Sequence, residues 1–184
     1  MFICLMFKYI LQYLNMNKCV FLDRDGVINK DYVDYVYTIE KFQLLEGVVE
    51  SLQNLKKVGY KLVIVTNQSG IVKGIYNKED VYLIYEHIQK LCGGLIDEMY
   101  YAQLHENFSR SLMRKPDSMM IEKGLAKYNV VPENSWMIGD KETDMIPAVK
   151  LGVNTILLSE NKKSTNAQYI STSLFEASKI ILNT

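Results

Sequence analysis

The sequence predicts an α/β fold: a doubly wound, mostly parallel sheet with helices on both faces. Segments with strand-like and helix-like spacing alternate along the 184 residues, as they do in repeated strand–helix–strand units with right-handed crossovers. The strand-like runs are continuously apolar, as in Leu-Val-Ile-Val at 62–65, and such runs are typical of parallel strands covered on both faces. No internal repeat or linker interrupts the alternation, so we expect 16–184 to form a single domain.

The individual elements are predicted in chain order from apolar spacing and from end signals. Strands are expected at 20–22, 61–65, 99–102, 136–138 and 153–158. Helices are expected between Val48 and Gly59, between Asn77 and Gly93, from Pro116 onward, after Thr143, and from Leu174 to Leu182. Asn77 and Thr143 are suited to cap their helices, and Pro147 is expected in a first turn, where no amide donor is needed.

The composition is that of a globular protein with balanced charge. The chain has 21 acidic and 21 basic residues, so it lacks the basic field that would hold nucleic acid. Its three cysteines show no disulfide or metal-binding spacing, which favours a reducing compartment and a cytoplasmic location. We therefore expect a small-molecule partner rather than a nucleic acid or a membrane, and a monomer or weak oligomer.

The first residues stand apart from this pattern. Residues 1–14 are largely apolar, but the run is shorter than the roughly 20 residues of a membrane span and lacks the basic start of a signal peptide. Because Met16 directly precedes the segment leading into the first strand, our hypothesis is that 1–15 are a non-native or flexible extension. The alternative is a short amphipathic or packing helix.

Four polar segments lie at the predicted strand ends or in the loops that follow them. They are Asp23-Arg24-Asp25-Gly26, Thr66-Asn67-Gln68-Ser69, Arg114-Lys115-Pro116 and Gly139-Asp140-Lys141-Glu142-Thr143-Asp144. In doubly wound sheets, ligands bind beyond the carboxyl ends of the strands. We therefore expect one site, whose carboxylates, hydroxyls and cations suit phosphoryl transfer.

Asp23 and Asp25 are the candidates for catalysis. A carboxylate at the end of the first strand, Asp23, can attack phosphorus and form an aspartyl-phosphate intermediate. Asp25 can protonate the leaving oxygen and then deprotonate the attacking water, while Gly26 permits a tight turn. On its own this short motif also occurs in ordinary loops and Ca²⁺ turns, so its interpretation depends on the other three segments.

The acidic residues also predict a Mg²⁺ site. Mg²⁺ takes about six oxygen ligands, usually one or two carboxylates with substrate phosphate and water. Asp23, Asp140 and the backbone carbonyl of Asp25 meet that need, and Asp144 is expected to orient Asp140 or a metal-bound water. Taken alone, the segment 139–144 would instead be a solvated turn and helix cap.

The other two segments supply hydrogen-bond donors and positive charge. The Thr66 hydroxyl and nearby backbone amides can donate to phosphate oxygens. We expect phosphate- or substrate-binding residues throughout this loop: Thr66, Asn67, Gln68 and Ser69. Lys115 can place a fixed charge on the transferring group, and Arg114 can offer a planar fork to a second anionic or hydroxyl-bearing part of the substrate. The alternatives are a generic strand-end turn and an exposed basic pair.

In this order, the four segments resemble those of haloacid dehalogenase superfamily phosphatases, which have a Rossmann-like sheet. The resemblance covers about 16–158, and the carboxylate at position 25 favours the phosphatases over the dehalogenases. The strings at 21–29, 65–71, 114–116 and 138–145 are most similar to the family of D-glycero-D-manno-heptose 1,7-bisphosphate 7-phosphatases and histidinol phosphatases. The members of this family lack a large cap domain, and the spacings here leave no room for one.

The resemblance implies a role for each matching residue. Asp23 would be the nucleophile and Asp25 the acid/base; the phosphoryl group would be stabilised by Thr66 and Lys115. Arg114 would recognise the substrate. The Mg²⁺ ligands would be Asp23, Asp140 and the carbonyl of Asp25. Lys141 and the segment 31–35 would lie near the substrate.

One departure from the family concerns zinc. The family usually carries a zinc loop of three cysteines and a histidine before its Arg-Lys-Pro segment. The corresponding stretch, 101–113, has no cysteine and a single histidine, His105. One histidine does not make a tetrahedral zinc site, so we expect no structural zinc.

The expected function is therefore Mg²⁺-dependent hydrolysis of a sugar phosphate through an aspartyl-phosphate, with a heptose bisphosphate of surface-glycan synthesis as the first candidate substrate. Histidinol phosphate or another small phosphomonoester is the alternative, because the zinc loop that recognises substrate in the family is missing. A non-catalytic phosphate-binding relative is disfavoured by the intact Asp23, Asp25, Lys115 and Asp140. A transferase or mutase is disfavoured because an uncapped site gives water free access.

Overall fold

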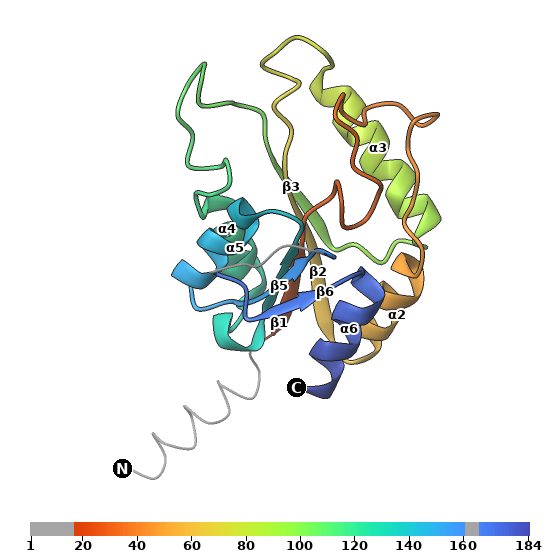
Figure 1. Ribbon diagram of the computed structural model, residues 1–184, viewed down its shortest axis with the longest axis vertical. Helices are drawn as coiled ribbons and strands as arrows, with labels where there is room; N and C mark the ends of the chain where they lie inside the picture. Colours follow the sequence, from red (N-terminus) through yellow and green to blue (C-terminus); the bar gives the residue numbers. More distant parts are fainter. Residues whose placement is uncertain (1–16, 161–165) are drawn as a thin grey trace.

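The computed structural model describes residues 17–160 and 166–184, and its centre is one six-stranded parallel sheet (Figure 1). The strands are β1 (Lys18–Leu22), β2 (Tyr60–Asn67), β3 (Glu98–Ala102), β4 (Trp136–Gly139), β5 (Asn154–Leu158) and β6 (Tyr169–Ser171). The helices are α2 (Val48–Lys57), α3 (Lys78–Leu91), α4 (Met119–Tyr128), α5 (Glu142–Lys150) and α6 (Leu174–Asn183), with a 3₁₀ turn at Pro132–Asn134. The predicted doubly wound sheet is confirmed.

The strand order is β3-β2-β1-β4-β5-β6, and it places the crevice of the fold. The chain runs outward from β1 through β2 to β3, then returns to the other side of β1 and runs outward through β4, β5 and β6. The direction therefore reverses between β1 and β4, and doubly wound sheets bind ligands at such a switch point. The Asp23 amide donates to the Ile138 carbonyl at 2.9 Å, so the pairing of β1 with β4 continues to the point where the polar residues begin.

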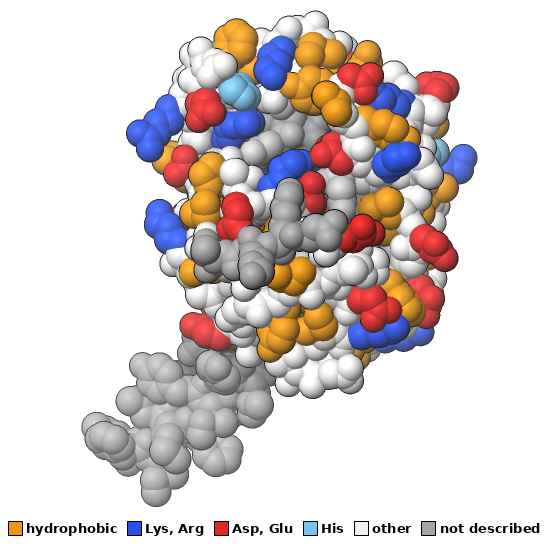
Figure 2. All heavy atoms as spheres, viewed as in Figure 1, with side chains coloured by type: hydrophobic (Ala, Val, Ile, Leu, Met, Phe, Trp, Pro, Cys, Tyr) orange, Lys and Arg blue, Asp and Glu red, His pale blue; other side chains and the backbone are white. Residues whose placement is uncertain are grey.

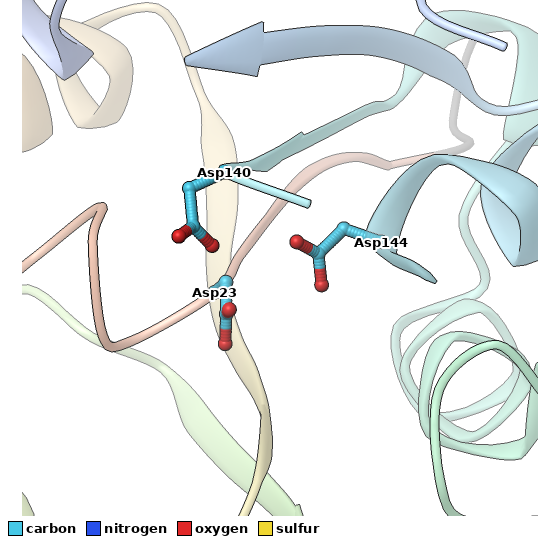
Figure 3. A group of neighbouring side chains, drawn as sticks. All are labelled: Asp23, Asp140 and Asp144. Carbon is cyan, nitrogen blue, oxygen red and sulfur yellow. The ribbon is translucent and has the colours of Figure 1, made fainter. Parts of the chain in front are cut away.

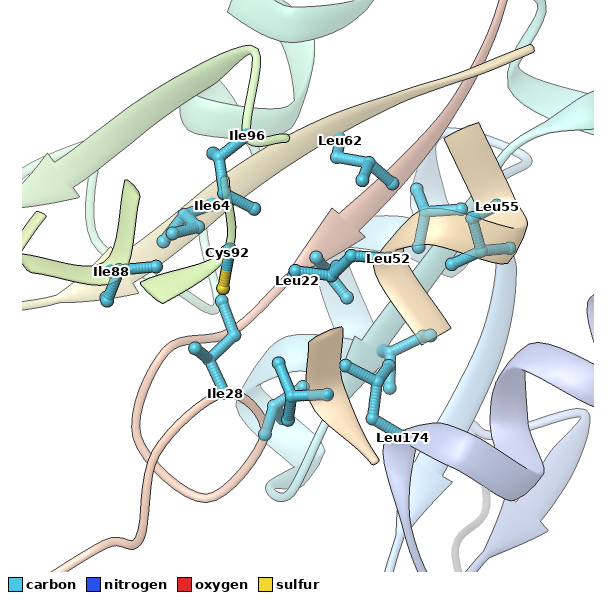
Figure 4. Close-up of a cluster of buried hydrophobic side chains, with 14 of the residues drawn as sticks. Leu22, Ile28, Leu52, Leu55, Leu62, Ile64, Ile88, Cys92, Ile96 and Leu174 are labelled. Atoms are coloured by element: carbon cyan, nitrogen blue, oxygen red, sulfur yellow. The ribbon is translucent and has the colours of Figure 1, made fainter. Parts of the chain in front are cut away.

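Helices cover both faces of the sheet. Side chains that alternate along each strand enter two buried clusters, so Val20 and Leu22 of β1 face one side while Cys19 and Phe21 face the other. The first cluster contains apolar residues of α2, α3 and α6, including Leu52, Leu55, Ile88 and Leu174 (Figure 4). The second contains those of α4 and α5. This burial on both faces explains why the strands are continuously apolar.

Two helix starts differ from the prediction. Helix α4 begins at Met119 rather than Pro116, because the Asp117 amide closes a turn onto the Arg114 carbonyl at 2.8 Å. Helix α5 begins at Glu142, so Thr143 does not cap it and Pro147 lies inside it.

The start of α5 is set by a carboxylate that serves the first turn. Asp144 accepts from the Lys141 amide at 3.0 Å, and its own amide donates to the Lys141 carbonyl. The predicted cap at Asn77 is present, since its side chain accepts from the Asp80 amide at 3.0 Å.

One strand was not predicted, and one hypothesis falls outside the described residues. The edge strand β6 was missed because it has only three residues and exposes Tyr169 and Ile170, so it carries no apolar run. The hypothesis about 1–15 lies outside the described residues. Within the described ranges, each helix is too short or too polar to cross a bilayer.

Candidate active site

The end of β1 places Asp23 at the switch point of the sheet. Asp23 is largely buried, and its Oδ1 accepts from the Arg24 amide at 2.8 Å. Asp140 follows β4, the neighbouring strand, and Asp144 lies on the first turn of α5. Ligand oxygens of these three carboxylates lie within 4.8 Å of one another (Figure 3). The predicted juxtaposition of Asp23 and Asp140 is therefore present, with Asp144 beside them.

The turn after β1 brings its backbone against this cluster. Gly26 has a left-handed φ of +86°, and a Cβ built there would lie 2.7 Å from both Cγ and Oδ2 of Asp140. A side chain at this position would therefore meet the carboxylate at the centre of the site. Gly26 is required by this close approach as well as by its φ.

Lys115 carries a buried positive charge into the cluster. Its Nζ lies 2.9 Å from Asp23 Oδ1 and 2.6 Å from Asp144 Oδ1, and it donates to the Val65 carbonyl at 2.7 Å. Burial acts to lower the pKa of Lys115, but the charges of Asp144 and Asp23 outweigh it and raise that pKa. The ammonium therefore stays protonated, with its three donors all in use.

The acidic groups are held in an environment that opposes their ionisation. Burial, with Asp144 and Asp25 nearby, raises the pKa of Asp23 to about 6 although Lys115 acts to lower it. Burial and the charge of Asp23 also raise the pKa of Asp140. A further cation beside these two carboxyl groups would stabilise their ionised forms.

The donor set fits a small divalent cation. Asp140 Oδ1 is buried and has no hydrogen-bond partner among the described residues, whereas its Oδ2 faces Lys141 Nζ at 3.2 Å. Asp144, in contrast, already engages both oxygens, one with Lys115 and one with the Lys141 amide. Asp140 therefore has an oxygen free to bind a cation, whereas Asp144 holds Lys115 and the Lys141 amide in place. Carboxylate oxygens such as that of Asp140 suit Mg²⁺.

Asp25 lies outside the carboxylate cluster, in a network of donors. Arg24 forms a bidentate contact with it, from Nε to Oδ2 at 3.1 Å and from Nη2 to Oδ1 at 2.9 Å. Asn29 Nδ2 donates to Oδ1 at 2.9 Å, and Gln68 Nε2 donates to Oδ2 at 3.2 Å. Arg24 is almost fully buried and also donates to the Val36 carbonyl. Sequence reasoning assigned no role to Arg24 or Asn29, although their place in the motif was a signal.

The predicted residues at the end of β2 and in the loop after it make different contacts. Thr66 and Gln68 are buried and bonded to each other, with Gln68 Nε2 2.9 Å from Thr66 Oγ1. The Asn67 side chain pairs with the Lys115 backbone, since it donates to the carbonyl and accepts from the amide, both at 3.0 Å. Ser69 is buried beside them. Asn67 therefore links the loop to the segment that carries Lys115.

Charged residues surround the site. Lys141 Nζ lies 3.0 Å from Asp31 Oδ2, which joins the loop after β1 to the start of α5. Arg114 Nη1 donates to the Leu104 carbonyl at 3.4 Å, and Arg114 lines a pocket of about 310 Å³ between 106 and 117. Acidic and basic side chains are intermixed over the face seen in Figure 2. Hydrogen bonds and ion pairs thus link most of the predicted site residues to one another, and Arg114 is joined to them through its chain neighbour Lys115.

The sequence matches the family model described as haloacid dehalogenase-like hydrolase over residues 5–158. The chain belongs to this family. The family and enzyme class expected from the sequence are confirmed.

Curated relatives include D-glycero-beta-D-manno-heptose-1,7-bisphosphate 7-phosphatases of Helicobacter pylori and Pasteurella multocida. The first is 37% identical over 162 residues, 85% of this chain and 92% of the relative. The second is 35% identical over 180 residues, 90% and 97% of the two chains. A Burkholderia mallei relative named for the alpha form is 36% identical, over 77% of this chain and 79% of its own.

Solved structures share the fold. The D,D-heptose 1,7-bisphosphate phosphatase from B. bronchiseptica, complexed with magnesium and phosphate, aligns with a TM-score of 0.81 and 20% identity. The alignment covers 91% of this chain and 99% of that one. At this identity the likeness establishes the fold alone.

Proposed function

We propose that the chain is a Mg²⁺-dependent phosphatase that removes the 7-phosphate of D-glycero-D-manno-heptose 1,7-bisphosphate. The observation that carries the reaction type is the Lys115 ammonium 2.9 Å from Asp23 Oδ1, at the switch point and beside two further carboxylates. The substrate follows from the curated relatives, which are up to 37% identical over most of both chains.

In the proposed reaction, an Asp23 carboxylate oxygen attacks phosphorus and displaces the sugar oxygen. The Lys115 charge keeps Asp23 in its ionised, nucleophilic form and offsets charge that develops on the phosphoryl oxygens. Asp25 protonates the leaving oxygen and then takes a proton from the water that attacks the aspartyl-phosphate. The Thr66 hydroxyl donates to a phosphoryl oxygen.

The metal would be held by Asp23, Asp140 and the Asp25 carbonyl, with Asp144 orienting Lys115 and the start of α5. The open, buried Oδ1 of Asp140 supports this assignment. When bound, Mg²⁺ neutralises negative charge on the phosphoryl oxygens. We propose no structural zinc, because the stretch 101–113 offers His105 and no cysteine.

Arg114 and Lys141 are proposed to recognise the rest of the substrate. Arg114 lies next to Lys115 in the chain and lines a pocket beside that segment, so it can offer a planar cation to the part of the substrate away from Asp23. Lys141 contacts both Asp31 and the proposed metal ligand Asp140. The two described cysteines, Cys19 and Cys92, are buried free thiols, which supports a cytoplasmic location. We propose that the protein is a monomer or weak oligomer.

Phosphate release from a substrate panel tests the function. The panel contains both anomers of the heptose bisphosphate, histidinol phosphate, a nucleoside monophosphate and p-nitrophenyl phosphate, each with Mg²⁺ and with EDTA. We expect the highest kcat/KM for a heptose bisphosphate, and loss of turnover with EDTA and in Asp23→Asn. The control is Glu133→Gln, which changes an exposed carboxylate on the 3₁₀ turn ahead of β4, away from the site.

Each outcome separates the levels of the proposal. A preference for histidinol phosphate would overturn the substrate and keep the reaction. Undiminished turnover in Asp23→Asn, with Glu133→Gln equal to the unchanged protein, would overturn the assignment of Asp23 as the nucleophile. Absence of phosphate release from every compound would favour a phosphate-binding protein without catalysis.

A further inference from the structure

We propose that Tyr76 and Gln68 form a positioning pair that holds the acid/base Asp25 and the phosphate donor Thr66 in one arrangement. The inference rests on the proposed function, since it concerns residues of that site. Its basis is a chain of hydrogen bonds through one side-chain amide. Tyr76 Oη donates to Gln68 Oε1 at 2.7 Å, and Gln68 Nε2 contacts Thr66 Oγ1 at 2.9 Å and Asp25 Oδ2 at 3.2 Å.

The chemistry of the partners fixes the direction of this chain. When Asp25 is ionised, as it must be to act as the base in the second step, its carboxylate only accepts hydrogen bonds, so the Gln68 amide must present its NH₂ group to it. The carbonyl oxygen of the amide then faces Tyr76, whose hydroxyl must donate. Burial raises the pKa of Tyr76 to about 12, so the phenol keeps this proton at neutral pH. Tyr76 therefore stabilises the flip of the Gln68 amide that the Asp25 carboxylate requires.

The selected flip prepares Thr66 for its proposed role. Because Thr66 Oγ1 accepts from Gln68, the hydroxyl proton is left to donate in another direction. A donor aimed before the substrate arrives loses no energy to reorientation during the reaction. Arg24 and Asn29 also hold Asp25, but the Gln68 amide differs in that it contacts Thr66 at the same time.

Tyr76 is itself held in place by its surroundings. Its ring stacks on Tyr37 with centroids 5.1 Å apart and meets Tyr35 edge-on at 5.8 Å. It also lies directly over Gly70, where a Cβ would come within 1.9 Å of its Cε1. Gln68 and Tyr76 are 1% and 7% exposed, so water does not compete for the shared hydrogen bond. Ring packing and burial therefore hold the Tyr76 hydroxyl against Gln68.

Steady-state kinetics of Tyr76→Phe, Gln68→Leu and the double variant tests the inference. Tyr76→Phe keeps the ring and removes the donor, so we expect kcat to fall by about fivefold to tenfold with little change in KM. Gln68→Leu should lower kcat further than Tyr76→Phe does. In the double variant, loss of the Tyr76 hydroxyl should cost nothing further, because it acts through Gln68. Independent effects that multiply would overturn the proposal, as would a kcat for Tyr76→Phe equal to that of the unchanged protein.

Gln68→Glu separates donation from shape. Glutamate has the size of glutamine and can accept from Tyr76, but when ionised it cannot donate to Thr66 or Asp25. We expect its kcat to fall at least as far as that of Gln68→Leu. Near-normal turnover in Gln68→Glu would show that the side chain only fills space, and would contradict the inference.

The fold offers a matched control pair away from the site. On α3, Gln89 Nε2 contacts Tyr85 Oη at 3.0 Å and also donates to the Ile96 carbonyl at 2.7 Å, ahead of β3. Tyr85→Phe and Gln89→Leu remove a bond of the same type at the opposite end of the strands, so they should leave kcat unchanged.

A readout that needs no turnover distinguishes this inference from the proposed function. In NMR spectra of the unchanged protein, the Gln68 side-chain NH₂ protons should exchange slowly with solvent, and in Tyr76→Phe clearly faster. Equal exchange in the two proteins would overturn the inference even if phosphatase activity is found. A phosphatase that hydrolyses p-nitrophenyl phosphate and rejects heptose bisphosphate would overturn the substrate and leave the kinetic cycle measurable.

Discussion

The Lys115 ammonium lies between two buried carboxylates, 2.9 Å from Asp23 and 2.6 Å from Asp144. The three residues come from the end of β1, the segment before α4 and the first turn of α5. One cation thus joins the proposed nucleophile to Asp144 on helix α5. Its removal should affect both activity and stability.

Lys115→Met is expected to lower kcat by about 10²–10³-fold, because the variant loses the charge that offsets the transferring phosphoryl group. It should also lower the free energy of unfolding in EDTA by about 3 kcal/mol, since two carboxylates are left buried without their partner. Chemical denaturation and phosphate release measure the two effects. The control is Lys179→Met, which removes a half-exposed partner of Glu176 and should change both by little. Full activity in Lys115→Met would contradict the assignment.

Gly26→Ala is expected to weaken Mg²⁺ binding by at least about tenfold, because its Cβ would displace the Asp140 carboxylate from 2.7 Å. Gly59→Ala is a matched control, since Gly59 has a similar φ of +89° and open space around its Cβ. Both variants should lose about 1 kcal/mol of stability through backbone strain. Calorimetric titration with Mg²⁺ should give a weaker affinity for Gly26→Ala than for Gly59→Ala. Equal affinities would show that the close approach of Gly26 to Asp140 does not matter for Mg²⁺ binding.

The raised pKa of Asp23 predicts a pH-dependent effect of the metal. Burial raises that pKa from 3.8 to about 6, so between these values the folded, metal-free chain binds more protons than the unfolded chain. The contribution of Asp23 to the stability of the metal-free chain should therefore fall as pH rises through this window. A cation replaces the proton, so Mg²⁺ should raise Tm over EDTA more at about pH 7.5 than at about pH 5. Equal Tm shifts at the two pH values would contradict this prediction.

Arg114→Lys is expected to raise KM for the heptose bisphosphate by about tenfold, since lysine keeps the charge and loses the planar fork. The kcat/KM for p-nitrophenyl phosphate should be unchanged, because that compound has no sugar and no second phosphate. The two substrates, assayed side by side, are each other's control. An equal loss for both would place Arg114 in the phosphoryl site rather than beside it.

The proximity of Asp23 and Asp140 was predictable because carboxyl ends of neighbouring parallel strands meet at one edge of a sheet. The contacts of Arg24 with Asp25, and of Tyr76 with Gln68, were not, because they depend on how loop side chains are buried together. The start of α5 was misplaced for a related reason: Asp144, rather than Thr143, satisfies its first turn. Local propensity located the elements, and long-range packing decided which side chains they bring together.

The central claim is a covalent phosphoryl intermediate on Asp23, and trapping that intermediate tests it most directly. Asp25→Asn should form the intermediate from p-nitrophenyl phosphate, whose leaving group needs no acid, and should hydrolyse it slowly because the base is missing. Acid-quenched samples are digested and analysed by mass spectrometry, with Asp23→Asn as the control. The account predicts a burst of p-nitrophenol stoichiometric with enzyme and one phosphoryl group on the Asp23 peptide. A burst with the phosphoryl group on another residue, or steady turnover with no phosphorylated peptide, would contradict it.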